Sequence, residues 1–131
     1  MTIDISNFIY AFVILLVFSI GTCAGQEVIN QSNFKNKIAK DIVVVEFWAE
    51  WNKANEFTEL NKLKDSSVYR VNIMHCTKLQ ADYNISAVPT VVVFDNGIEK
   101  ERFNANIMFQ LEADKKTIQT SIDTIILNKF Q

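Results

Sequence analysis

This chain of 131 residues has few of the side chains that bind metals or form disulfides. It contains two cysteines, Cys23 and Cys76, and a single histidine, His75. A structural zinc site takes a tetrahedral set of such ligands, so we expect no metal, and we expect no other cofactor. If the residues before Gln26 are removed, Cys76 is the only cysteine left and a disulfide within the chain is excluded.

A strong net charge is also lacking. The formal charge is −2, and the basic residues are scattered along the chain. Proteins that bind nucleic acids usually concentrate their basic residues in a patch or stripe, so we expect no nucleic-acid partner. No repeat, low-complexity stretch or linker follows residue 26, and 49% of all residues are apolar. Residues 26–131 are therefore predicted to fold as one domain with its own core.

Residues 1–25 form an apolar N-terminal segment. Its apolar run, residues 8–20, is broken only by Ser19 and is shorter than the roughly 20 residues that a membrane-spanning helix needs. The small residues at 21–25 suit a signal-peptidase site. This pattern predicts a signal peptide and a mature chain that starts near Gln26.

Two alternatives to cleavage stay open. Residues 1–7 contain Asp4 and no lysine or arginine, contrary to the usual positive start of a signal peptide, which favours an uncleaved anchor. Residues 20–23 loosely resemble a bacterial lipobox, which would make Cys23 a lipidated cysteine. All three interpretations place the domain outside the cytoplasm, as a periplasmic, secreted or lumenal protein. A membrane contact is expected only through this segment, if it is uncleaved or lipidated.

Apolar runs predict the strands. A central strand is expected over residues 42–51, because residues 42–45 form the continuous β-branched run typical of a strand covered on both faces. Residues 70–73 are predicted to form a neighbouring strand. Asn96-Gly97, which lies between apolar runs, is a strong signal for a two-residue hairpin loop.

Apolar residues at helical spacing predict the helices. Ser32 is expected to cap the first helix, and the second is expected at about residues 54–64. The pattern at residues 77–80 is typical of a capping box that starts the third. The residues expected to face inward are, in chain order, Phe34 and Ile38; Phe57, Leu60 and Leu63; Leu79 and Tyr83; and Ile118, Ile122, Ile125 and Ile126.

Residues 45–55, with the sequence VEFWAEWNKAN, resemble the active-site segment of the thioredoxin family, in which a buried strand leads through FWAxW into Cys-Gly-Pro-Cys. Residues 83–90 resemble the segment that carries the family's cis-proline, and residues 91–97 resemble the hairpin that follows it. The resemblance covers most of residues 28–130. It implies a thioredoxin-like α/β fold, with a central mixed β-sheet flanked by helices and a cis-proline at Pro89.

The chain departs from the family at the residues that carry its chemistry. Asn52 and Asn55 stand where the resemblance places two cysteines, and Lys53-Ala54 replaces Gly-Pro. Thiol–disulfide exchange needs one thiolate to attack and a second thiol to resolve the mixed disulfide, and an asparagine amide can do neither. This favours a redox-inactive protein that is not an enzyme. Asn52 is either a helix N-cap or, together with Asn55, a donor to the backbone of a bound peptide.

The resemblance also implies a groove for an extended peptide. In the family, the residue before the cis-proline offers its backbone N–H and C=O to a bound chain. The alternative is that the cis turn at Pro89 only closes the fold. Residues 104–111 are an insertion which, by the family's geometry, borders the groove. The candidate groove residues are Trp51, Asn52, Asn55, Val88, Pro89, Thr90, Met108 and Phe109.

Two further candidates are polar groups in apolar surroundings. Glu46 interrupts an apolar strand, where burial would raise its pKa unless a cation compensates. The resemblance places Arg70 beside it, so we expect a partly buried, structural ion pair with its charged groups within about 6 Å. Cys76 is either a reactive thiol, with its pKa lowered by the start of the third helix, or an inert core residue. His75 is expected to point away from it.

Three functions follow from these observations. The one we favour is a redox-inactive binding module that acts outside the cytoplasm and holds a protein or an extended peptide segment. The second is a monothiol protein, linked to disulfide exchange or glutathione, which would use an exposed Cys76. The third is a structural or assembly domain that associates through a sheet edge or the last helix.

Overall fold

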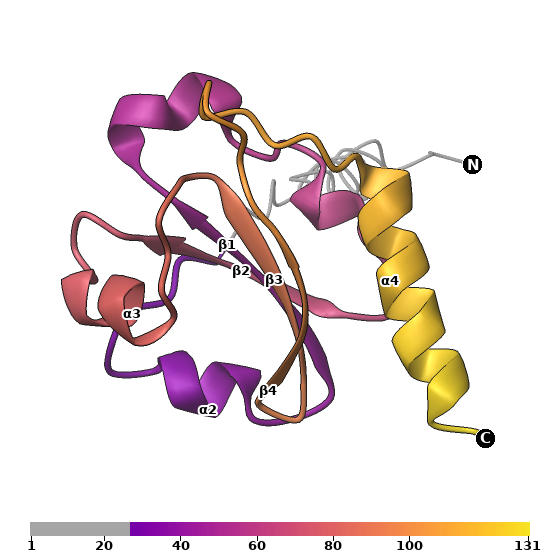
Figure 1. The fold of residues 1–131 in the computed structure, drawn as a ribbon. Coiled ribbons are helices and arrows are strands. Elements are labelled where there is room, and N and C mark those ends of the chain that lie inside the picture. The colour runs from indigo at the N-terminus through magenta and orange to yellow at the C-terminus, as the bar shows by residue number, and fades with distance from the viewer. Residues whose placement is uncertain (1–26) are drawn as a thin grey trace, which may run out of the picture.

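The computed structural model describes residues 27–131 (Figure 1). Its centre is a sheet of four strands in the order β2-β1-β3-β4. The strands are β1 (Ile42–Trp48), β2 (Ser67–Asn72), β3 (Thr90–Asp95) and β4 (Ile98–Phe103). β1 pairs in parallel with β2 and antiparallel with β3, and β3 pairs antiparallel with β4. The sheet is therefore mixed.

The N-terminal segment predicted to be a signal peptide or an anchor, residues 1–25 with Cys23, lies outside the described residues. Among residues 27–131, no helix has both the length and the apolar character that crossing a bilayer requires.

Helices cover both faces of the sheet. α2 (Phe34–Ile38) and α3 (Thr77–Asp82) pack on one face, and α4 (Lys115–Asn128) packs on the other (Figure 1). Successive side chains of a strand point to opposite faces, so β1 contributes alternately to the two apolar clusters. Because both clusters are closed by helices, the β-branched run at residues 42–45 is buried throughout.

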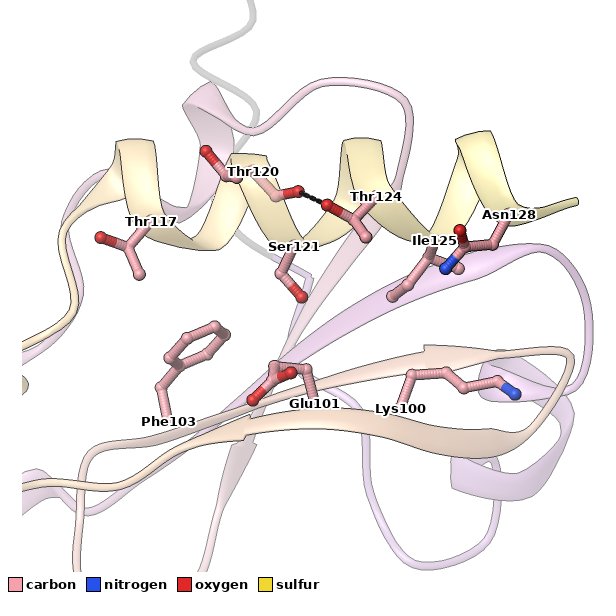
Figure 2. A pocket seen from close by; sticks show the side chains of 9 residues that line it. All are labelled: Lys100, Glu101, Phe103, Thr117, Thr120, Ser121, Thr124, Ile125 and Asn128. Atoms are coloured by element: carbon pink, nitrogen blue, oxygen red, sulfur yellow. Dashed lines mark hydrogen bonds between the residues drawn. The ribbon is translucent and has the colours of Figure 1, made fainter.

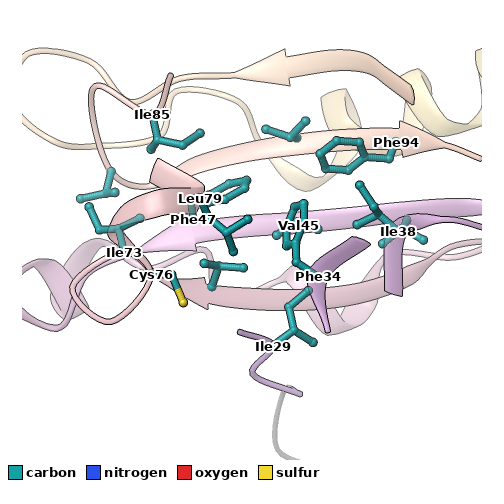
Figure 3. Packing of buried hydrophobic residues seen from close by; sticks show 14 of the residues in the cluster. Ile29, Phe34, Ile38, Val45, Phe47, Ile73, Cys76, Leu79, Ile85 and Phe94 are labelled. Atoms are coloured by element: carbon teal, nitrogen blue, oxygen red, sulfur yellow. The ribbon is translucent and has the colours of Figure 1, made fainter. Parts of the chain in front are cut away.

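Aromatic rings pack among aliphatic side chains in the cluster under α2 and α3 (Figure 3). The Phe34 ring lies between three others, with centroids 5.0 Å from Tyr83, 5.9 Å from Phe47 and 6.0 Å from Phe94. These are tilted or edge-on contacts, which aromatic pairs prefer to face-to-face stacking. The cluster ties α2 to both central strands.

The predicted strands are present with shifted ends. β1 ends at Trp48 rather than Trp51, and β2 covers Ser67–Asn72 rather than residues 70–73. The hairpin loop is at Asn96-Gly97 as predicted, with φ values of 49° and 82°, the left-handed values that a type I′ turn requires.

The last helix is also present as predicted. α4 is capped by Asp114, whose Oδ1 accepts a hydrogen bond from the Thr117 N–H at 2.8 Å. Ile118 and Ile122 are buried against the sheet. Ile125 and Ile126 pack at the edge of the same cluster.

The prediction of a helix at about residues 54–64 is wrong. The chain instead forms two short 3₁₀ helices, η1 (Glu50–Asn55) and η2 (Leu60–Lys62). Residues 56–59 lie between them, and Glu56 is extended with φ −60° and ψ 150°. The segment after β1 is therefore a pair of turns and not a continuous helix.

A buried carboxylate accounts for this break. The Phe57 N–H, which a continuous helix would bond within itself, donates to Glu46 Oε1 at 2.6 Å. A hydrogen bond to a carboxyl oxygen in the protein interior is electrostatically stronger than one in water, so this bond competes with the bond that a helix would make. The spacing of Phe57, Leu60 and Leu63 still predicted their burial correctly, since all three are in the core.

Both predicted helix caps are wrong as well. Asn33, not Ser32, stands at the N-cap of α2, and Asn30 Oδ1 accepts the N–H groups of Ser32 and Asn33 at 2.9 and 3.3 Å. α3 begins at Thr77 with Cys76 at its N-cap, and neither helix has a side-chain cap bond of the expected kind.

Residues 104–111 fold into a small hairpin, called here the 104–111 hairpin. Ala105 and Leu111 form an antiparallel bridge at its base. Asn106 shapes the turn, because its Oδ1 accepts the N–H groups of Met108 and Gln110 at 2.9 and 3.1 Å. Figure 1 shows this orange segment rising from β4 to meet the magenta η1.

Candidate functional site

Three segments that are far apart in the sequence meet at one end of the sheet. They are η1, which follows β1; the residues that lead into β3; and the 104–111 hairpin. The Val88–Pro89 peptide bond, which precedes β3, is cis. The candidate groove residues lie in these three segments, and Asn52 is at the centre of the junction.

The Asn52 amide joins all three segments. Its Nδ2 donates to the carbonyl oxygens of Val88 and Phe109, each at 2.9 Å. Its Oδ1 accepts a hydrogen bond from Asn55 Nδ2 at 2.8 Å. Asn52 lies at a kink within η1, with the non-helical values φ −114° and ψ 25°. Its Oδ1 accepts the Asn55 side chain and not a backbone N–H, so it does not make the bond of a helix N-cap.

The backbone around the cis-proline is enclosed. Val88 is 2% exposed, Pro89 is buried, and Thr90 is 0% exposed. The Thr90 hydroxyl donates to the Ala87 carbonyl at 2.7 Å, so it too is used within the chain. The Val88 carbonyl, which the sequence interpretation offered to a bound peptide, accepts the Asn52 amide instead.

Apolar side chains are exposed directly above this enclosed backbone. Trp51 is 59%, Ile107 96%, Met108 68% and Phe109 43% exposed. The rings of Trp51 and Phe109 meet edge to face, with centroids 5.2 Å apart. We call these four residues the apolar tip. Trp48, by contrast, is partly buried, with the Arg70 guanidinium 5.8 Å above its ring.

The Asn106 side chain is a part of the site that sequence reasoning missed. Asn106 holds the turn that presents Ile107, Met108 and Phe109. An asparagine that bonds the backbone two residues further on is a recognised turn pattern, so the signal was present in the sequence.

Glu46 and Arg70 form an ion pair beneath the site. Arg70 Nε lies 2.6 Å from Glu46 Oε2, and Arg70 also reaches Glu56 Oε2 at 3.1 Å and the Phe57 carbonyl at 3.2 Å. Burial raises the pKa of Glu46 above its ordinary value of 4.5, and the Phe57 N–H and Arg70 only partly oppose that rise. The cluster fastens the segment after η1 to the sheet.

Cys76 lies in the core and not at a surface. It is 4% exposed and packs in the cluster under α2 and α3, whereas His75 beside it is exposed. It is the free cysteine of the described part of the chain. Among residues 27–131, no three His, Cys, Asp or Glu side chains are grouped so as to hold a metal ion.

A surface pocket of ≈ 470 Å³ lies elsewhere, between β4 and α4 (Figure 2). Its α4 side is rich in hydroxyl groups, but Thr120 and Thr124 donate theirs to main-chain carbonyls one turn earlier, at 2.8 Å each. None of the candidate groove residues lines it. We therefore place the candidate site at the junction centred on Asn52.

The fold and the junction define an α/β domain with a mixed sheet and a cis-proline beside its first central strand. The family model named Thioredoxin matches residues 25–117. The thioredoxin of Mycoplasma genitalium is 39% identical over 70 residues, which cover 49% of this chain and 69% of that protein. The thioredoxin of Chlamydia trachomatis is 29% identical over 82 residues, covering 58% and 80%. The chain belongs to the thioredoxin family.

Solved structures agree with the predicted thioredoxin-like fold. A mutant thioredoxin from Halobacterium salinarum matches with a TM-score of 0.59 and 22% identity, covering 79% of this chain and 95% of that one. A thioredoxin from Malassezia sympodialis matches with a TM-score of 0.60 and 24% identity, covering 76% and 90%. At this level of identity the likeness concerns the fold alone, and the function is argued from the site.

Proposed function

We propose that the chain is a redox-inactive member of the thioredoxin family that binds a protein or peptide segment outside the cytoplasm. The observation that carries the proposal is the Asn52 amide, which is bonded to two carbonyls of its own chain at the place where the resemblance puts an attacking thiol. An amide so placed cannot begin disulfide exchange.

The buried position of Cys76 supports the same conclusion. Disulfide exchange requires a thiolate that an attacking or attacked sulfur can reach. Cys76 is 4% exposed and no second cysteine is present in residues 27–131. The monothiol alternative therefore gains no support from the geometry.

The apolar tip is the contact surface in this proposal. Trp51, Met108 and Phe109 supply large or adaptable apolar side chains, which are the residue types that dominate recognition surfaces. No charged side chain occurs between Phe103 and Leu111, so a partner can cover the hairpin part of the tip without burying a charge of that segment. The location outside the cytoplasm rests on the N-terminal pattern of residues 1–25.

The test is selection of ligands on the full chain from a random-peptide display library, followed by titration of the enriched peptides. We expect Ile107→Ser to weaken binding at least about tenfold, because it removes an apolar contact from the tip. Ile98→Ser is the matched control, since Ile98 is an exposed isoleucine at the β3–β4 turn, and its effect is expected to stay within about twofold. Enrichment of no peptide, or equal losses in both variants, would contradict the proposal.

A further inference from the structure

We propose that Asn52 is the positioning residue of the contact surface: its amide locks the 104–111 hairpin onto the Val88 carbonyl and so fixes the apolar tip for a partner that presents apolar side chains. This inference rests on the proposed binding function and assigns the mechanism by which the surface is held.

The hydrogen bonds fix the direction of the Asn52 amide. Both donors of Nδ2 are used, one on Val88 and one on Phe109, while Asn55 supplies a donor to Oδ1. With the amide reversed, its oxygen would face two carbonyl oxygens and its NH₂ group would face that of Asn55. Only one orientation therefore satisfies all three neighbours.

The same bonds decide where the hairpin lies. The carbonyl of Phe109, on the hairpin, and the carbonyl of Val88, before β3, both lie 2.9 Å from a single nitrogen atom. This brings the Phe109 ring against Trp51, with 5.2 Å between centroids. The hairpin is therefore held by two contacts at Phe109: the hydrogen bond from Asn52 to its carbonyl, and the packing of its ring on Trp51.

The arrangement also defines the kind of partner. The Val88 carbonyl accepts the Asn52 amide and Val88 is only 2% exposed, so the backbone before the cis-proline is not an open edge to which an extended chain could add. The exposed groups that remain are the side chains of the apolar tip. A partner is therefore recognised by apolar side chains and not by addition of a strand.

Asn52→Asp is the decisive variant. It keeps the shape of the side chain and replaces the donating NH₂ with an oxygen that faces two carbonyl oxygens. Residues 84–90 and 104–111 have no ionisable side chain, and the charged groups nearest in the sequence to Asn52 are Glu50, Lys53 and Glu56. The wild type, measured over the same pH range, shows what these groups contribute. Asn61→Asp, on the exposed surface of η2, adds the same charge without touching the hairpin.

The experiment uses the full chain and a peptide enriched by display on the wild type. In Asn52→Asp we expect loss of the nuclear Overhauser contact between the Trp51 and Phe109 rings and at least about tenfold weaker peptide binding near pH 7. Below about pH 4, where a carboxyl group is protonated and donates one hydrogen bond, part of the binding returns. Asn61→Asp shows none of these changes.

Equal or tighter peptide binding by Asn52→Asp would overturn the inference. It would mean that the hairpin blocks the binding surface and does not form part of it. An unchanged Trp51–Phe109 contact would overturn it as well. If Asn52→Asp does not fold, Asn55→Ala is used, which removes only the donor to Asn52 Oδ1 and is expected to weaken binding about threefold. If the wild type binds no displayed peptide, that result contradicts the proposed function, and the inference that rests on it is contradicted as well.

Discussion

At the scale of single residues, two polar side chains organise the end of the sheet that carries the site. Asn52 ties η1 to Val88 and to Phe109, and Glu46 ties the chain after η1 to β1 and β2. Each is a polar group with several partners. Leaving one such group unpaired costs more than the bonds contribute on average, which makes both positions sensitive to substitution.

Glu46 gives the protein a distinctive dependence of stability on pH. The folded state raises the pKa of Glu46 above 4.5, mainly through burial, so in that range the folded state binds more protons than the unfolded state. The contribution of this group to stability is therefore complete below about pH 4.5 and is lost as the pH rises through the raised pKa.

Denaturant unfolding of Glu46→Gln against the wild type measures this contribution. We expect the free energy of unfolding of the wild type, minus that of the variant, to fall as the pH is raised from about 4.5 towards 7. Glu112→Gln, at an exposed position, serves as the control for the loss of one acidic side chain. A difference that rises with pH would show that Arg70 outweighs burial and that the pKa of Glu46 is lowered in the folded state.

At the scale of elements, the segments that depart from regular structure are the ones that build the site. η1 and η2 replace a helix because Glu46 takes the Phe57 N–H. The 104–111 hairpin has a bridge at its base, two backbone hydrogen bonds across its turn, and the Asn106 side chain, which accepts two further N–H groups. Asn52 joins it to the rest of the domain at Phe109. Because most of these bonds lie within the hairpin, we expect it to open separately from the sheet.

Asn106→Ala tests that separation. The substitution removes the acceptor of the Met108 and Gln110 N–H groups, so we expect amide hydrogen exchange of these two residues to become at least about tenfold faster. The global free energy of unfolding is expected to fall by about 1 kcal/mol or less, since the lost bonds are exposed. Asn104→Ala, in the same segment, is the control. Global unfolding at mild denaturant concentration would show that the hairpin and the sheet are one cooperative unit.

At the scale of the whole molecule, the sequence predicts the fold but does not predict the contacts within the site. The β-branched run at residues 42–45, the Asn96-Gly97 turn and the isoleucines of α4 each predict their element through local periodicity or turn chemistry. The sequence does not predict the hydrogen bonds of Asn52, because its acceptors lie 36 and 57 residues away in the sequence. Such contacts depend on tertiary packing, which a local pattern does not encode.

The measurement that tests the account most directly is the rate of insulin reduction by dithiothreitol in the presence of the full chain, beside a Cys76→Ser variant. We predict that neither protein accelerates the reaction over dithiothreitol alone, because positions 52 and 55 carry amides and the Cys76 thiol is buried. Acceleration by the wild type that disappears in Cys76→Ser would contradict it and would make Cys76 the centre of a monothiol mechanism.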